Sequence, residues 1–219
     1  MTQSGRVDYS TDEMMTVAAS HELEDRVVCF VGIGLPSEAA NLARDARAEL
    51  LPDLRVRHSG RQTRRPSPQH FNTTVVGPYD APKVRPPGAG GAPEIAASAR
   101  EVIVVLSQTP RAFVERLDFV TSVGYGRGGG SRGRLSYHGA GPTAIITDLG
   151  ILRPDPETRE FTLVSLHPGA TVERAREATG WDLEVAKRLD ETESPTGEEL
   201  EILRDLQART EALRERPKS

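Results

Sequence analysis

The stretch RVVCFVGIGLPSEAANL, residues 26–42, decides the fold of this chain. Residues 27–31 form an unbroken apolar run with β-branched members, which is typical of a strand buried on both faces in a parallel sheet. Two glycines end this run in residues 32–35, and the sequence then predicts a helix over residues 36–47. A strand, a glycine turn and a helix N-terminus place free backbone N–H groups at the carboxyl end of a sheet. There they can hold an anion or a polarised carbonyl oxygen.

The first glycine turn does not carry a nucleotide fingerprint. The third glycine of a dinucleotide-binding motif is absent. Glu38 lies in the first turn of the predicted helix, where its carboxylate would repel a phosphate. Most such turns only reverse the chain, so a structural turn is the favoured interpretation of this pattern taken alone. A nucleotide-binding Rossmann domain is not predicted.

Composition gives no indication of a nucleic-acid or membrane partner. The chain has 219 residues, enough to bury a sizeable core, and its net charge is −4. No stretch approaches the roughly 20 apolar residues that span a bilayer, and no signal peptide is recognised. The single cysteine, Cys29, cannot form an internal disulfide. We expect a cytoplasmic protein with a flexible tail at residues 1–9 and a single domain at residues 10–215.

The order of strand, turn, helix and strand repeats further along the chain. Residues 71–76 are predicted as a strand from their composition, and a proline-rich surface loop follows them. Residues 88–91 form a second glycine turn, after which a short helix opens and runs to Arg100. Residues 101–107 are another buried strand. This repetition predicts an α/β architecture.

The remaining segments carry helix caps, a hairpin and two unusual loops. Capping boxes begin one helix near residue 10 and a charged helix near residue 196. Segments 143–152 and 160–166 predict a hairpin, and the glycine-rich segment 124–141 predicts a flexible loop. Segment 58–70 carries several arginines. It is either a solvated loop, which we favour, or a cationic loop that meets the phosphates of a ligand.

Five blocks of this sequence resemble a known family. They are GIGLPSEAANLAR, NTTVVG, APKVRPPGAGGAPEIAAS, RAFVERLDFVTSVGYG and VSLHPGATVERAREATGWDL, in this order. Together they resemble the β subunit of family I coenzyme A transferases of the glutaconate and 3-oxoadipate type. The resemblance covers most of residues 9–206. No single block is decisive, but five in sequence are hard to explain by chance.

The resemblance implies a fold, a reaction and a partner. The implied fold is an open α/β fold with a mainly parallel sheet and helices on both faces, shortened in the middle. The implied reaction moves coenzyme A (CoA) from an acyl-CoA to a carboxylic acid, here an oxo- or dicarboxylic acid. CoA is thus a substrate, and no metal is expected. The implied partner is a CoA-transferase α subunit, in a heterodimer or heterotetramer.

The resemblance also implies the site residues. In this family a β-chain glutamate attacks the thioester and forms an acyl-glutamyl anhydride, then a glutamyl-CoA thioester. Backbone amides of two glycine turns hold the carbonyl oxygen during this reaction. On this chain the corresponding acyl-CoA-binding residues are Gly32, Ile33, Gly34, Gly88, Gly90 and Gly91.

The chain departs from the family pattern at the nucleophile. The family glutamate lies at a strand end and is followed by serine and glycine. Here Ser59 and Gly60 are present, but His58 stands at the place of the glutamate. The family also carries several tens of residues between this motif and NTTVVG, whereas in this chain only residues 61–71 bridge the gap. His58 is therefore the candidate catalytic residue, either as a general base for water, since imidazole titrates near pH ~6.5, or as an exposed histidine without a role.

Three functions remain open from the sequence. The leading one is a CoA-transferase β subunit that uses another carboxylate, although Glu38, Glu49 and Glu94 do not occupy the expected position. The second is an acyl-CoA hydrolase or carbon–carbon cleaving enzyme on the same scaffold. The third is a non-catalytic subunit that stabilises a partner.

Overall fold

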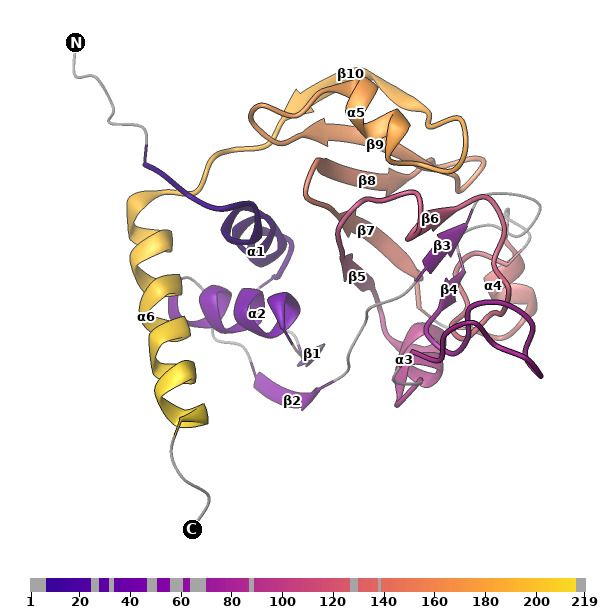
Figure 1. Cartoon of the computed structure of the whole chain (residues 1–219), viewed down its shortest axis with the longest axis horizontal. Helices are drawn as coiled ribbons and strands as arrows, with labels where there is room; N and C mark the ends of the chain where they lie inside the picture. The colour runs from indigo at the N-terminus through magenta and orange to yellow at the C-terminus, as the bar shows by residue number, and fades with distance from the viewer. Residues whose placement is uncertain are drawn as a thin grey trace. The chain divides into compact units, whose positions relative to one another are not determined.

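The computed structural model describes residues 7–24, 28–31, 34–46, 51–55, 61–63, 70–86, 89–126, 130–137 and 139–215. They fall into two compact units (Figure 1). Unit 1 combines Met1–Arg55 with Glu193–Ser219, and unit 2 is Val56–Thr192. The expectation of one domain stays a prediction.

Among the described residues of unit 1 are three helices and a pair of strands. The strands are parallel, as expected for a strand–helix–strand unit. The helices α1 and α2, and α2 and α6, pack on one another around Val17, Leu42 and Leu203, which are fully buried. The elements of this unit are α1 (Thr11–His21), β1 (Val28–Val31), α2 (Leu35–Ala46), β2 (Leu51–Arg55) and α6 (Gly197–Arg214).

Both predicted capping boxes of unit 1 are formed. Ser10 N–H donates to Glu13 Oε2 at 2.7 Å, and Glu13 N–H donates to Ser10 Oγ at 3.2 Å. The corresponding bonds join Thr196 and Glu199 at the start of α6. Each box satisfies two amides that a helix start leaves free. His21 at the end of α1 also lies 2.7 Å from Glu199 Oε1, which links the two helices.

Unit 2 is organised by an open five-stranded sheet. Its strand order is β10-β9-β8-β7-β5, and Figure 1 shows the strands one beside the next. The strand β8 is antiparallel to β7 and β9, whereas β5 with β7 and β9 with β10 pair in parallel. Four of the strands thus share one direction. The strands are β5 (Val102–Val105), β7 (Pro142–Ile146), β8 (Gly150–Pro154), β9 (Phe161–Leu166) and β10 (Val185–Glu191).

The described residues of unit 2 also form a smaller sheet and three short helices. The strand β3 is antiparallel to β4 and parallel to β6. Phe71 of β4 also forms an isolated antiparallel bridge with Ser122. The strand β4 therefore pairs with β3 and, through Phe71, with Ser122. The elements are β3 (Arg61–Thr63), β4 (Phe71–Asn72), β6 (Phe113–Val114), α3 (Ala92–Ser98), α4 (Ser131–Arg134) and α5 (Val172–Glu177).

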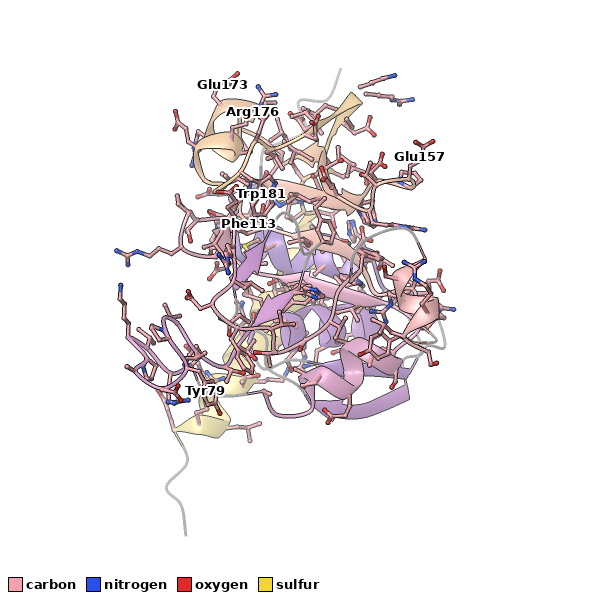
Figure 2. The ribbon with its side chains drawn as sticks, turned by 90° about the vertical axis from the view of Figure 1, so that its right-hand side faces the viewer. Tyr79, Phe113, Glu157, Glu173, Arg176 and Trp181 are labelled. Atoms are coloured by element: carbon pink, nitrogen blue, oxygen red, sulfur yellow. The ribbon has the colours of Figure 1, made fainter. Side chains whose placement is uncertain are left out.

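The core of unit 2 lies between the large sheet and the segments that follow β5 and β9. Ile145, Leu152 and Leu163 are fully buried. Phe113 is also fully buried, and its ring centroid lies 5.8 Å from that of Trp181. Figure 2 labels both side chains, which lie one beside the other. Aliphatic side chains of the sheet and a few aromatic rings therefore hold this unit together.

The α/β class and the open, mostly parallel sheet are confirmed, and four local predictions differ. The expected strand over residues 71–76 ends at Asn72, because Asn72 Oδ1 accepts from the N–H groups of Thr74 and Val75 and closes a turn. Segment 143–152 is two strands, because Thr147 Oγ1 accepts from two following amides. The glycine-rich segment contains α4, and β10 was not predicted.

Candidate functional site

The first glycine turn enters α2 through a left-handed residue. Gly34 has φ +93°, and its carbonyl accepts from Ser37 N–H at 2.9 Å and Glu38 N–H at 3.1 Å. A Cβ at Gly34 would meet no atom within 4 Å, so the glycine is required for its backbone angle and the space beside it is open. Gly32 and Ile33 lie outside the described residues.

The second glycine turn enters α3 in a similar way. Gly90 has φ +51°, and a Cβ there would also meet no atom within 4 Å. The turn is closed by a bond of 3.0 Å from Ala92 N–H to Ala89 O. Within the described part of the chain, the N–H groups of Gly90 and Gly91 donate to no acceptor. They remain available to a ligand, while Gly88 lies outside the described residues.

The predicted catalytic position cannot be placed, because His58 lies outside the described residues. Of the carboxylates weighed as replacements for the glutamate, Glu38 accepts from Gln207 Nε2 at 2.7 Å and is thereby tied to α6. Glu94 is exposed in the first turn of α3, the usual place for a carboxylate that interacts with the helix dipole. Glu49 is also outside the described residues. The structure therefore identifies no replacement nucleophile among the residues that it describes.

A buried polar cluster lies beyond the carboxyl ends of β5, β7 and β9. Gln108, which follows β5, accepts from Thr147 Oγ1 at 2.9 Å and donates to Thr179 Oγ1 at 2.9 Å and to Ala175 O at 3.0 Å. Parallel strands bring their carboxyl ends to one edge of a sheet, where α/β proteins bind ligands. We call Gln108, Thr147, Asp148, His167 and Thr179 the strand-end cluster.

His167 is the least satisfied member of the strand-end cluster. It is 4% exposed, and its Nε2 lies 2.8 Å from Thr147 O. Because a carbonyl oxygen only accepts, Nε2 carries the proton, and the buried Nδ1 has no partner in the described part of the chain. Burial lowers the pKa of His167, while the bond to Thr147 and the charge of Asp148 act in the opposite direction. The ring is neutral at neutral pH.

His70 is a half-buried histidine that the sequence patterns did not single out. The sequence placed it at the end of a polar loop, although it directly precedes the strand residues FN. In the structure His70 is half-buried, and its Nδ1 accepts from Gly124 N–H at 3.1 Å. Burial lowers its pKa. The adjoining strand was the only local signal that it is more than a solvated histidine.

The described residues hold neither a metal cluster nor a membrane helix. They contain no group of three or more histidine, cysteine, aspartate or glutamate side chains placed to hold a metal ion. Among the helices that the structure describes, none combines the length and the apolar character needed to cross a membrane.

Comparison with known proteins identifies the family. Residues 66–178 match the family described as Coenzyme A transferase. The chain is 45% identical over 249 residues to the B subunit of 3-oxoadipate CoA-transferase from Pseudomonas knackmussii, a match that covers 93% of this chain and 95% of the relative. Because this alignment is longer than the 219 residues of the chain, the relative carries residues that this chain lacks.

Two further relatives support the assignment. The chain is 37% identical over 137 residues to the B subunit of glutaconate CoA-transferase from Acidaminococcus fermentans, covering 62% of this chain and 51% of that protein. The crystal structure of this glutaconate CoA-transferase matches 90% of our chain and 94% of its own, with a TM-score of 0.79 and 25% identity. The cholesterol ring-cleaving hydrolase IpdB subunit of Rhodococcus jostii is 26% identical over 135 residues, 62% of this chain and 53% of that protein.

The glycine turns, the open sheet and these matches agree with one another. The family match spans about half of the chain, and the 45% identity extends along nearly all of it. The chain therefore belongs to the coenzyme A transferase family, in which it is similar to the B, or β, subunits.

Proposed function

We propose that this chain is the β subunit of an enzyme that moves CoA between an acyl-CoA and a carboxylic acid, and that it works with an α subunit. The observation that carries the proposal is the 45% identity to the B subunit of a 3-oxoadipate CoA-transferase over 93% of this chain. Both CoA-transferase relatives are named as B subunits, which supports a second, α-type partner. We infer a heterodimer or heterotetramer.

The proposed acid substrate is an oxo- or dicarboxylic acid. The two CoA-transferase relatives are named for 3-oxoadipate and glutaconate, and both of these acids carry two carboxylates. The CoA thioester is the other substrate. A site that must distinguish such an acid from a simple fatty acid needs a donor for the second carboxylate, because a charged group is bound well only when it is paired or hydrogen-bonded.

Each glycine turn, taken by itself, is proposed as a donor to the thioester carbonyl oxygen. The proposed residues are Gly32, Ile33 and Gly34 in the first turn and Gly88, Gly90 and Gly91 in the second. Three observations support this role: left-handed φ angles at Gly34 and Gly90, open space beside both, and free N–H groups at Gly90 and Gly91 within the described part of the chain. A preorganised donor aimed at a developing oxyanion lowers the barrier by about 3–4 kcal/mol.

The nucleophile decides between transfer and hydrolysis. A carboxylate forms a covalent anhydride with the acyl group and retains CoA in the next step, whereas a histidine can activate water and release the acid. His58 stands where the family glutamate is expected. A hydrolytic or carbon–carbon cleaving reaction is therefore the second candidate, and the similarity to the cholesterol ring-cleaving hydrolase IpdB subunit favours it over a non-catalytic role.

The decisive experiment uses the chain co-produced with a CoA-transferase α subunit from the same organism. The complex is incubated with succinyl-CoA and 3-oxoadipate, and the products are separated by chromatography. Formation of 3-oxoadipyl-CoA supports the proposed transfer. Free CoA in the absence of an acceptor acid, lost in His58→Ala, supports hydrolysis instead. A complex that forms but catalyses neither reaction contradicts both enzymatic proposals.

The nucleophile can be named directly by mass spectrometry. The complex is mixed with acyl-CoA without an acceptor acid, treated with borohydride or hydroxylamine, and digested. A glutamyl-CoA thioester reacts with either reagent at one glutamate, which the altered peptide mass identifies. If the modified glutamate belongs to the α subunit, the transfer reaction stands without the family glutamate on this chain. If no glutamate of either subunit is modified while CoA is transferred, the covalent route is wrong.

A further inference from the structure

His70 is held in one tautomer by a backbone amide. Gly124 N–H donates to His70 Nδ1 at 3.1 Å. A ring nitrogen that accepts a hydrogen bond carries no proton, so the proton of the neutral imidazole is on Nε2. The geometry therefore presents Nε2–H as a donor of fixed direction on a half-buried side chain. Its lowered pKa agrees with a neutral ring.

The amide that fixes His70 is itself polarised by a buried arginine. Arg132 is 7% exposed, and its Nη1 donates to Gly124 O at 2.9 Å and to Val123 O at 3.4 Å. The Val123 carbonyl and the Gly124 N–H belong to the same peptide unit. Hydrogen bonds in such a chain strengthen one another in a low-dielectric interior. The positive charge behind this peptide therefore strengthens the bond to Nδ1 and keeps the proton of His70 on Nε2.

The Nε2–H of His70 has no acceptor among the residues that the structure describes. Burial is the cause of its lowered pKa. The Nε2 atom is not among the described side-chain atoms that are buried without a partner, so it is accessible to a ligand. A donor that has a fixed direction and no partner in the protein is typical of a ligand-binding residue in the absence of its ligand.

The surroundings of His70 favour an anionic oxygen as this ligand. Thr73 Oγ1 and Ser122 Oγ are buried without a partner in the described part of the chain, and both residues lie in the segments that flank the Phe71–Ser122 bridge. Hydroxyl groups and an imidazole N–H are donors of the kind that bind a carboxylate.

We propose that His70 Nε2 donates a hydrogen bond to a carboxylate of the acid substrate. This inference rests on the proposed transfer of CoA to an oxo- or dicarboxylic acid. In this role His70 is a substrate-binding residue and takes no part in bond formation. It orients the acid, and Arg132 is the positioning residue that acts through the Gly124 amide. The predicted subsite lies entirely within unit 2.

Two substitutions separate binding from support of the fold. His70→Asn places an amide oxygen near the position of Nδ1, so it can still accept from Gly124 N–H, but it has no group at the position of Nε2. His70→Gln places an amide N–H near the position of Nε2 and loses the acceptor at Nδ1. A merely structural histidine would tolerate Asn and not Gln, whereas a binding histidine would tolerate Gln better than Asn.

The first measurement is steady-state kinetics of the complex with the α subunit. A lost hydrogen bond to a charged group lowers affinity by about 10- to 100-fold. We expect His70→Asn to raise the KM for 3-oxoadipate by this factor, with the KM for acetyl-CoA, whose acyl group has no free carboxylate, changed by less than about 2-fold. His70→Gln should recover most of the loss. Equal KM values for 3-oxoadipate in wild type and His70→Asn would overturn the inference.

The second measurement does not depend on catalysis. The purified protein, with histidines labelled with ¹⁵N, is titrated with 3-oxoadipate, with succinate and with inorganic phosphate, and the His70 Nε2 resonance is assigned from its loss in His70→Asn. A shift that saturates with either dicarboxylate supports the inference even if the enzyme proves not to transfer CoA. No shift with either dicarboxylate, or a shift with phosphate alone, overturns the carboxylate subsite and leaves the proposed transfer to its own test.

Discussion

Arg132 Nη2 lies 2.8 Å from the carbonyl oxygen of Ala96, in the last turn of α3. The same guanidinium donates to Ala97 O at 3.3 Å, Gly124 O at 2.9 Å and, through Nε, Gly139 O at 3.0 Å. The last carbonyls of a helix have no intrahelical partner and carry partial negative charge. The buried arginine therefore caps α3 and ties three separate segments of unit 2 together.

Replacing Arg132 should destabilise the protein strongly. Arg132→Ala leaves several buried carbonyls without a donor and opens a cavity, so we expect a loss of about 3 kcal/mol in the free energy of unfolding, measured with urea. Arg188→Ala is the matched control, because the Arg188 side chain is 91% exposed and should contribute less than about 0.5 kcal/mol. Similar losses in the two variants would contradict the assigned role of Arg132.

His167 should make stability depend on pH. Its folded-state pKa is lowered by burial, so the unfolded chain binds the proton more readily, and stability falls as pH decreases below about 6.5. His167→Gln can keep a donor to Thr147 O but cannot titrate. The free energy of unfolding, measured with urea at pH 7.5, 6.5 and 5.5, should decline less steeply in this variant, by at most about 1.4 kcal/mol per pH unit. His70 is present in both proteins, so parallel curves would rule out His167 as the cause.

Gly180 should tolerate no side chain. A Cβ at this position would lie 2.6 Å from Phe113 O, the carbonyl that accepts from Gly180 N–H at 2.8 Å. Gly180→Ala must separate these backbones and should cost about 1–3 kcal/mol in urea unfolding. Gly197→Ala is the control, because a Cβ there meets no atom within 4 Å and alanine favours the helix that Gly197 begins. A neutral Gly180→Ala would show that this contact relaxes without cost.

Gly90 should matter more for catalysis than for folding. Gly90→Ala introduces no contact within 4 Å, but alanine adopts φ +51° at a cost of about 1–2 kcal/mol, so the turn should shift and its N–H groups change direction. We expect kcat of the complex for CoA transfer to fall about 10- to 100-fold. The control is Gly169→Ala, at another open glycine with positive φ, +82°. If both variants lose kcat equally, the second glycine turn has no special role.

Local signals in the sequence were sufficient for several elements. The capping pairs Ser10 with Glu13 and Thr196 with Glu199 are three residues apart, and both form as predicted. The apolar run before the first glycine turn gives β1, and α2 follows it. The turns at Gly34 and Gly90 could be recognised because glycine adopts positive φ without strain. The five sequence blocks were sufficient to recognise the family.

Other features were decided by residues far apart in the sequence. The strand β10 is rich in charged residues and lies at the edge of the sheet, so it lacks the apolar pattern by which buried strands are recognised. The helix α4 is held in place by its own Arg132, whose partner Ala96 is 36 residues away. No window of local sequence contains both residues.

The sequence by itself determined the α/β class, the helix starts, the glycine turns and the family of this protein, because each depends on neighbours within a few residues or on whole blocks. Only the tertiary structure identified His70, because its tautomer depends on Gly124, 54 residues further along the chain. The physical reason is general: a hydrogen bond between distant residues exists only after folding has overcome the entropy of bringing them together, and the sequence records no local trace of it.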